Sequence, residues 1–271
     1  MNLSSLLYGG PGSGKTTFAV SSFWDWKNQR PVVRDGKELK GKLVLFGREN
    51  NPALGVPEDS IIRFSSPSLD NDKWLRDFEG FMASLIKAAR QGNKLDALVI
   101  DGMSEWDLLY EEVFERMNAG TRDKFAKWEA LLRDGFSTMQ RADTIELGCQ
   151  ILVTARVMEK KKAIQSTTGK VIASGDPEYM DFDYYPSLRG SFRLHFPHYF
   201  NLVLYADTNV KLVNGKKRPV HSLSMVRHGD FYVKNVFEYQ WLEEEKPIEL
   251  YNPSYWEVYD MLTQRKEAAG A

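Results

Sequence analysis

Residues 9–16 read Gly-Gly-Pro-Gly-Ser-Gly-Lys-Thr and match the pattern G-x-x-x-x-G-K-[ST] in full. The match follows an apolar run from Leu3 to Tyr8 and precedes a predicted helix that begins near Lys15. Glycines permit the positive φ angles that turn backbone N–H groups inward, and a helix N-terminus favours anions. The stretch therefore predicts a cradle for the phosphates of ATP or a related nucleoside triphosphate. Its expected contacts are Gly9, Gly10, Pro11, Gly12, Ser13, Gly14, Lys15, Thr16 and Thr17.

A magnesium site is expected beside this cradle. Lys15 is predicted to bridge the β- and γ-phosphates, and the Thr16 hydroxyl is predicted to bind Mg²⁺. Asp101 ends the apolar run from Ala97 to Ile100, so its carboxylate would emerge at the carboxyl edge of a parallel sheet, where ligands of such sheets bind. We therefore expect Asp101 to be the second protein group near the metal.

The catalytic base is not settled by the sequence. The residue after Asp101 is Gly102, so a glutamate has to come from elsewhere. Glu49 follows the apolar run from Leu43 to Phe46 and is our predicted base, which would orient a water for attack on the γ-phosphate. Glu105, one helical turn past Asp101, is the alternative. Both glutamates would otherwise be ordinary surface charges.

Apolar runs alternate with helical patterns along the chain. We predict strands at 3–8, 43–46, 98–100, 151–153 and 202–205, and amphipathic helices over residues 74–89 and 125–139. This alternation predicts an α/β fold with a mostly parallel central sheet flanked by helices. A polar hairpin turn is expected at residues 34–36 and a terminal helix from Pro253 to about Lys266. We predict one domain over 1–271, with a core over about 1–207 and a β extension with the terminal helix over about 208–271.

Composition limits the possible partners. The 271 residues are 42% hydrophobic with a net charge of -1, which predicts no global attraction to nucleic acid or to a membrane. The single cysteine, Cys149, cannot form an internal disulfide, and no apolar run is long enough to span a membrane. No room for a signal peptide precedes Gly9, so we expect a cytoplasmic protein.

Four stretches together resemble a known family. They are residues 8–17, residues 99–105, residues 153–160 and residues 231–235, in that order. They are similar to phage AAA-domain nucleotide-binding proteins, the RecA-like single-strand annealing ATPases of bacteriophages. The resemblance implies a RecA-like P-loop core, an ATP hydrolase active in phage DNA recombination, and single-stranded DNA as partner. It also implies a single-strand DNA-binding protein as a second partner, a homo-oligomer, and the host cytoplasm as location.

The chain departs from this family at two places. The family often has Thr-Ala-His at the end of its fourth strand, whereas this chain has Thr154, Ala155 and Arg156. The resemblance places Thr154 and Arg156 near the nucleotide, with Arg156 contacting phosphate in place of the histidine. Lys234 is followed by Asn235 and Val236, so Lys234 alone is the expected cation for a neighbouring subunit's nucleotide. A solvent-exposed strand lysine is the alternative.

A lysine-rich stretch follows the fourth predicted strand, and in RecA-like proteins this loop faces the DNA. Lysines suit phosphate backbones without selecting a sequence, and aromatic rings stack on unpaired bases. The alternative is a solvated loop whose aromatic residues fold onto the core. The expected DNA contacts are Lys160, Lys161, Lys162, Lys170, Tyr184 and Tyr185.

Two other functions use the same phosphate loop. A small-molecule or nucleotide kinase would need an arginine-bearing lid, for which Arg189, Arg193 and Arg218 are available. A non-catalytic nucleotide-binding accessory protein of phage replication or packaging would keep Lys15 and lack a working base.

Overall fold

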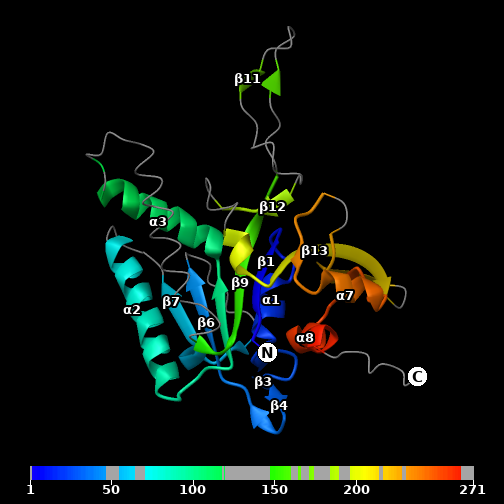
Figure 1. Cartoon of the computed structure of the whole chain (residues 1–271), viewed down its shortest axis with the longest axis horizontal. Helices are drawn as coiled ribbons and strands as arrows, with labels where there is room; N and C mark the ends of the chain where they lie inside the picture. The colour runs from blue at the N-terminus through cyan, green and yellow to red at the C-terminus, as the bar shows by residue number, and fades with distance from the viewer. Residues whose placement is uncertain are drawn as a thin grey trace.

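The computed structural model of the chain describes residues 2–46, 55–64, 71–117, 119, 147–159, 164–165, 171–173, 184–188, 196–213, 216–227 and 230–263. A ten-stranded sheet runs through this part of the chain in the order β16-β14-β13-β1-β9-β8-β6-β7, with β12 beside β9 and β15 beside β13. The structure is therefore α/β, as the alternation of apolar runs and helical patterns predicts (Figure 1).

The central strands of this sheet are parallel. The parallel set is β13 (Leu202–Val213), β1 (Ser4–Gly9), β9 (Gln150–Glu159), β8 (Ala97–Asp101), β6 (Gly41–Phe46) and β7 (Ile61–Phe64). All five predicted strands are confirmed within this set, whereas β7 was not expected. The sequence of β7, Ile-Ile-Arg-Phe, is short and contains a charged residue, so this edge strand is not recognisable as an apolar run.

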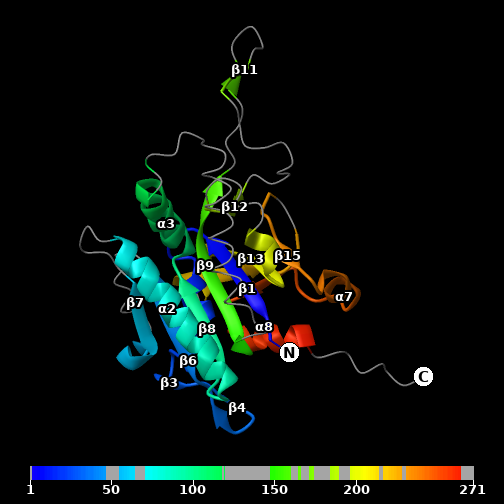
Figure 2. The same cartoon turned by 60° about the vertical axis from the view of Figure 1, so that its left-hand side comes forward.

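Helices cover both faces of the sheet, because alternate residues of each strand point to opposite sides. On one face, Leu6 and Tyr8 of β1 pack with α2 (Asn71–Arg90) and α3 (Met103–Met117). On the other face, Leu3 and Leu7 pack with α1 (Lys15–Val20), α7 (Glu238–Glu243) and α8 (Tyr255–Thr263). Figure 2 shows α2 and α3 together on one side and α8 on the other. The predicted helix over residues 74–89 is confirmed as part of α2.

The C-terminal strands join this same sheet. An antiparallel hairpin links β13 to β14 (Lys216–Ser224), and β14 pairs with β16 (Glu249–Tyr251). The predicted core boundary at residue 207 therefore falls inside β13 rather than between elements. The change in sequence pattern near Val210 marks the point where β13 leaves its parallel neighbour β1, whose last paired residue is Gly9 opposite Ala206.

Shorter elements complete the described chain. The hairpin turn predicted at residues 34–36 is confirmed between β4 (Val33–Arg34) and β5 (Lys37–Glu38). The other short elements are β2 (Trp24–Asp25), β3 (Arg30–Pro31), β10 (Ile164–Gln165), β11 (Val171–Ala173), β12 (Tyr184–Pro186), β15 (Lys234–Asn235) and the 3₁₀ helices Glu58–Ser60 and Phe196–Tyr199. The helix predicted over residues 125–139 lies outside the described residues. No helix in the described part of the chain combines the length and apolar character needed to cross a bilayer.

Candidate functional site

The glycine-rich loop of residues 9–16, named the phosphate loop here for its predicted ligand, meets Asp101 at the carboxyl edge of the parallel strands. The loop follows β1 directly, and Asp101 is the last residue of β8. Strand β9 lies between β1 and β8, with Thr154 opposite Leu7. Because parallel strands end at the same edge of a sheet, β9 places its own side chains between the loop and Asp101.

Glycine is required at three positions of the loop. Gly12 and Gly14 have φ angles of 74° and 84°, and Gly14 is the N-cap of α1. A Cβ atom at Gly9 would lie 2.0 Å from the carbonyl oxygen of Ala206 on the adjacent strand β13. The backbone therefore turns sharply from β1 into α1, which leaves the amide groups of the loop and the helix N-terminus at the sheet edge.

Lys15 contacts the loop itself in this structure. Its ammonium donates hydrogen bonds to the carbonyl oxygens of Gly9 at 3.0 Å and Gly10 at 2.7 Å, and to the hydroxyl of Ser13 at 3.2 Å. These contacts place a positive charge at the mouth of the loop. Phosphate binding by Lys15 stays a prediction from the motif.

Thr16, Asp101 and Thr154 form a hydrogen-bonded cluster. The Thr16 hydroxyl donates to Oδ2 of Asp101 at 2.8 Å, and the Thr154 hydroxyl donates to Oδ1 of the same carboxylate. The Thr154 oxygen in turn accepts a hydrogen bond from the backbone N–H of Gly102 at 3.1 Å. Thr154 is only 2% exposed, so it orients Asp101 rather than presenting its own side chain to a nucleotide.

The chemistry of this cluster suits a hard cation. A carboxylate and a hydroxyl oxygen are ligands that Mg²⁺ accepts, and Mg²⁺ is normally held by one or two carboxylates together with substrate phosphates and water. Within the described residues no group of three or more His, Cys, Asp or Glu side chains gathers at one point. The residues that fit Mg²⁺ are therefore Thr16 and Asp101, the two expected from the sequence.

Arg156 and Glu105 form an ion pair next to the loop. Arg156 lies opposite Gly9 in the register of β9 and β1, and its guanidinium contacts the carboxylate of Glu105 at the start of α3. The backbone N–H of Arg156 donates to the Ser104 hydroxyl at 2.9 Å, and that hydroxyl donates to the carbonyl of Ser187 at 2.7 Å. Arg156 is thus close to the loop, and its partner is the alternative base.

Several predicted residues lie outside the described residues. They are Glu49, Lys160, Lys161, Lys162, Lys170, Arg189 and Arg193. Their roles as catalytic base, DNA contacts and lid arginines stay predictions.

Lys234 is anchored away from the phosphate loop of its own chain. It pairs with Val203 at the start of β13, whereas the loop follows Gly9, which lies opposite Ala206. Its ammonium donates to the carbonyl oxygens of His198 at 2.9 Å and Phe200 at 2.7 Å. Burial lowers the pKa of Lys234. These contacts stabilise the end of a 3₁₀ helix, and a role at a neighbouring subunit's nucleotide stays a prediction.

The two predicted stacking tyrosines have different environments. Tyr184 is half-buried and stacks on Phe231 with ring centroids 5.2 Å apart, and Phe231 stacks on Tyr205 at 3.8 Å. Tyr185 is 1% exposed, so its ring is inaccessible to a base. Its prediction as a DNA contact is therefore wrong, and Tyr185 is a core residue. Adjacent strand residues point to opposite faces, so only one of the two tyrosines can face outward.

Thr208 and His221 contact the loop, although no sequence motif marks them. They are register partners on β13 and β14. The Thr208 hydroxyl donates to the carbonyl of Gly12 at 2.9 Å and lies 3.1 Å from Nδ1 of His221. A Cβ atom at Gly14 would lie 2.8 Å from the His221 ring. The single hydroxyl proton is used on Gly12, so Nδ1 of His221 is the donor in its contact with Thr208.

A pocket of about 910 Å³ adjoins the loop on this side. Ser13, Gly14 and Thr17 line one part of it, and Trp26, His221 and Trp256 line others. Ligand pockets for small molecules commonly have volumes of about 300–1,000 Å³ and apolar or aromatic walls with a few polar groups. The phosphate loop thus opens into a space of suitable size for a nucleoside.

Neither the protein-family models nor the curated proteins compared with this chain gave a match.

Proposed function

We propose that the chain is a Mg²⁺-dependent ATP hydrolase with a RecA-like P-loop core. One observation carries the proposal: the Thr16 hydroxyl meets the Asp101 carboxylate at 2.8 Å beside a glycine-rich loop that ends in Lys15. Thr16 and Asp101 are far apart in the sequence, and the fold brings them together beside the loop, as is expected for this motif. The parallel sheet is compatible with this core and supplies the edge at which nucleotides bind.

Each residue has a distinct task in this proposal. Lys15 exchanges its loop carbonyl partners for the β- and γ-phosphates, where its charge offsets the charge that develops during phosphoryl transfer. Thr16 and Asp101 hold Mg²⁺, which neutralises phosphate charge when bound. Thr154 keeps the Asp101 carboxylate oriented through its hydroxyl. Glu49 is the proposed base, because the alternative Glu105 is paired with Arg156.

The pocket beside the loop supports a nucleoside triphosphate as substrate. It is continuous with Ser13 and Gly14, so a ribose and base attached to phosphates on the loop would enter it. His221 offers a polar ring there, and ring walls from Trp26 and Trp256 offer apolar contact.

The proposed biological setting is phage DNA recombination or single-strand annealing, and it rests on the resemblance of four sequence stretches. In that setting the chain is a homo-oligomer that binds single-stranded DNA and works with a single-strand DNA-binding protein. The half-buried Tyr184, stacked on Phe231, supports base stacking near the loop after β9.

Phosphate release from ATP, measured with and without Mg²⁺ and single-stranded DNA, tests the proposal. We expect release that requires Mg²⁺ and rises with DNA. The variant Lys15→Ala should lose triphosphate binding or turnover while keeping the native circular dichroism spectrum. Unchanged turnover in that folded variant would remove the central claim. A requirement for an acceptor molecule would favour a kinase, and nucleotide binding without release would favour an accessory protein.

A further inference from the structure

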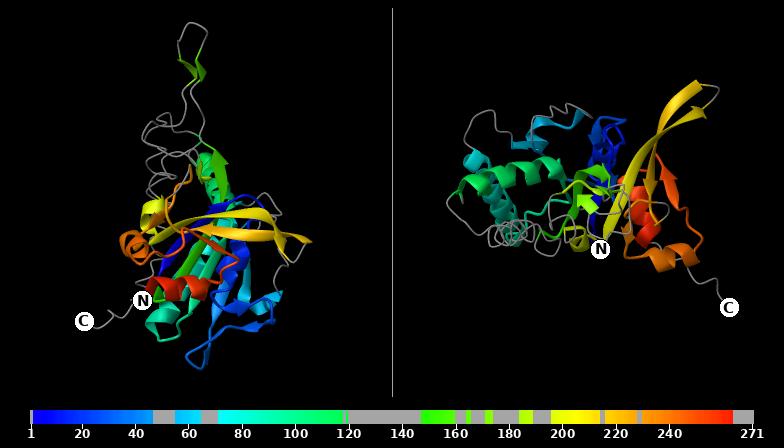
Figure 3. Two further views of the ribbon diagram at one scale, coloured as in Figure 1. Left: turned by 90° about the vertical axis from the view of Figure 1, so that its right-hand side faces the viewer. Right: turned by 90° about the horizontal axis from the view of Figure 1, so that it is seen from above.

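The outer half of the β13–β14 hairpin extends beyond the rest of the sheet. Strand β1 pairs with β13 only as far as Ala206, and β16 pairs with β14 only from Ser222 onward. Beyond Thr208 and His221 the two strands pair only with each other in the described structure, from Asn209 opposite Val220 to Val213 opposite Lys216. Figure 3 shows this ribbon projecting from the body of the molecule. We call residues 209–220 the outer ribbon.

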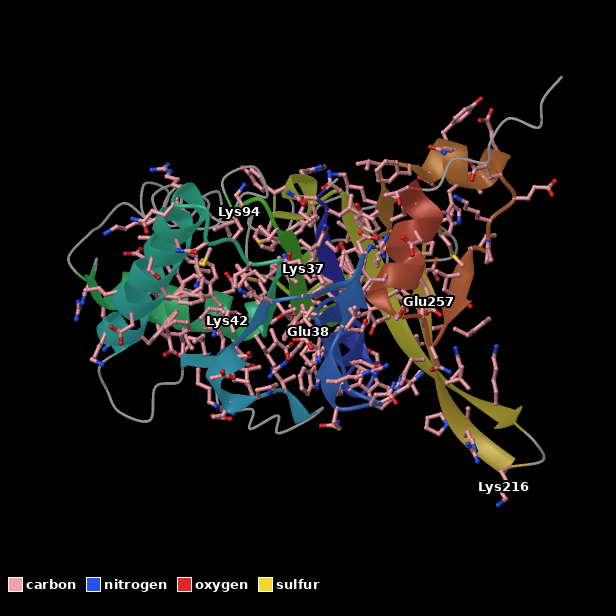
Figure 4. The ribbon with its side chains drawn as sticks, turned by 90° about the horizontal axis from the view of Figure 1, so that it is seen from below. Lys37, Glu38, Lys42, Lys94, Lys216 and Glu257 are labelled. Atoms are coloured by element: carbon pink, nitrogen blue, oxygen red, sulfur yellow. The ribbon has the colours of Figure 1, made fainter. Side chains whose placement is uncertain are left out.

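The outer ribbon is strongly basic. It contains Lys211, Lys216, Lys217 and Arg218 and no acidic residue, whereas the whole chain has a net charge of -1. All four cations are exposed. Within the described residues none of them forms an ion pair with an acidic side chain. Lys216 lies near the tip of the ribbon, far from Lys37, Lys42 and Lys94 (Figure 4).

Three of the four cations, Lys211, Lys216 and Arg218, share one face of the ribbon, whereas Lys217 points to the other face. Lys211 lies directly opposite Arg218 in the register, and Lys216 is two residues before Arg218. Residues two apart share a face and are about 6.6 Å apart. Like charges directly opposite each other destabilise a strand pair, so repulsion between Lys211 and Arg218 destabilises the ribbon. A bound polyanion would neutralise these charges and remove that repulsion.

An exposed aromatic ring adjoins the base of the outer ribbon. Tyr251 on β16 is 49% exposed, and the Lys211 ammonium lies 3.3 Å from the centroid of its ring. Cations that follow a backbone, together with a ring on which a base can stack, are the combination that binds single strands without sequence preference.

Lysines on an exposed edge strand also prevent edge-to-edge association, which is the simpler explanation of their presence. Edge protection favours lysine, but it needs only scattered charges. It does not account for two cations directly opposite each other, as Lys211 and Arg218 are. We propose that the outer ribbon is a contact for the phosphate backbone of single-stranded DNA. The choice of DNA as the polyanion rests on the proposed function, but the ribbon's binding does not require ATP turnover.

A salt series with a labelled oligothymidine and no nucleotide tests this inference. The variant Lys211→Gln/Lys216→Gln/Arg218→Gln is compared with the native chain and with Lys37→Gln/Lys42→Gln/Lys94→Gln, which removes the same charge elsewhere. Each lost phosphate contact should flatten the log–log salt slope by about 0.7 for single strands. We expect the ribbon variant to bind more weakly with a slope flatter by up to about 2, and the control to keep the native slope.

Other outcomes overturn the inference. Equal slopes of log affinity against log salt concentration for the native chain and the ribbon variant would mean that the ribbon does not contact DNA. A native chain that does not bind the oligothymidine would overturn the inference as well. Aggregation of the variant with native affinity would assign the lysines to edge protection. A changed oligomeric state with native DNA affinity would assign the ribbon to a second copy of this chain. DNA binding through the ribbon without any ATP turnover would keep this inference and refute the ATPase.

Discussion

At the residue scale, Gly102 explains why the chain has no glutamate after Asp101. Gly102 has a φ angle of 96°, which other residues rarely adopt, and it lets the chain turn from β8 directly into α3. A Cβ atom there would lie 3.2 Å from the carbonyl oxygen of Phe46. The backbone geometry that presents Asp101 to the loop is thus incompatible with a catalytic side chain at the next position.

Thr154 provides the residue-scale prediction. The variant Thr154→Val keeps the shape of the side chain but removes the hydroxyl that donates to Asp101 and accepts from the Gly102 N–H. Residues that orient a metal ligand typically contribute about 10- to 100-fold in metal affinity. We expect the Mg²⁺ concentration for half-maximal ATP hydrolysis to rise by roughly that factor.

The control for Thr154→Val is Thr263→Val, which removes a half-buried hydroxyl that donates to the Tyr259 carbonyl within α8, away from the phosphate loop. Both variants should be titrated with Mg²⁺ at saturating ATP. An unchanged Mg²⁺ curve for Thr154→Val would show that Asp101 does not need its threonine partner.

At the element scale, the β13–β14 hairpin joins the phosphate loop to the outer ribbon. Thr208 and His221 contact Gly12 and Gly14, and the basic residues of the ribbon begin three residues further out at Lys211. A β-ribbon is stiff across so short a distance, because its strands are cross-linked by backbone hydrogen bonds. The loop and the ribbon therefore share one structural element.

Thr208→Val is the element-scale prediction. The variant loses the hydrogen bond to the Gly12 carbonyl and leaves Nδ1 of His221 without its acceptor. A neutral hydrogen bond contributes about 1 kcal/mol, which corresponds to roughly fivefold in affinity. We expect ATP to bind roughly fivefold more weakly by isothermal titration calorimetry.

Asn209→Ala is the matched control for Thr208→Val, because Asn209 is exposed and points to the opposite face of the same strand. It should leave ATP affinity unchanged. Equal affinities for the native chain and Thr208→Val would mean that the hairpin does not support the loop.

At the scale of the whole molecule, buried acidic groups make the fold sensitive to high pH. Burial raises the pKa of Cys149 to about 12 and of Tyr205 to about 12, and it raises the pKa of Tyr8 and Tyr255 as well. These groups stay protonated in the folded state at pH values where the unfolded chain loses the protons. The unfolded state then binds fewer protons, so stability falls as pH rises.

The whole-molecule prediction is a fall in the free energy of unfolding above about pH 8.5, the ordinary pKa of an unfolded cysteine, with a steeper fall above about pH 10 from the tyrosines. Urea denaturation at several pH values from 8 to 11 measures it. Tyr255→Phe removes one such group and a hydrogen bond to Gln150, so it should lower stability at pH 8 and flatten the alkaline fall. Constant or rising stability up to pH 11 would contradict the burial of these groups.

Features that depend on neighbouring residues could be predicted from the amino-acid sequence. The phosphate loop at 9–16, the strand end at Asp101 and the turn at residues 34–36 all follow from contiguous patterns, because φ angles, helix starts and strand ends are set locally. The five central strands were also predictable, since strands buried on both faces of a parallel sheet are continuous apolar runs.

Contacts between residues far apart in the sequence could not be predicted and are seen only in the folded chain. The pairing of Thr154 with Asp101, of Arg156 with Glu105 and of Thr208 with Gly12 depends on strand order and register, which follow from packing across the whole sheet. The same register placed Tyr185 in the core and Lys211, Lys216 and Arg218 on one face of the outer ribbon, because a shift of one residue would reverse every side chain. The order of apolar and polar residues predicts that a segment is a strand, but it does not predict which strand lies beside it. These contacts are therefore known only from the folded chain.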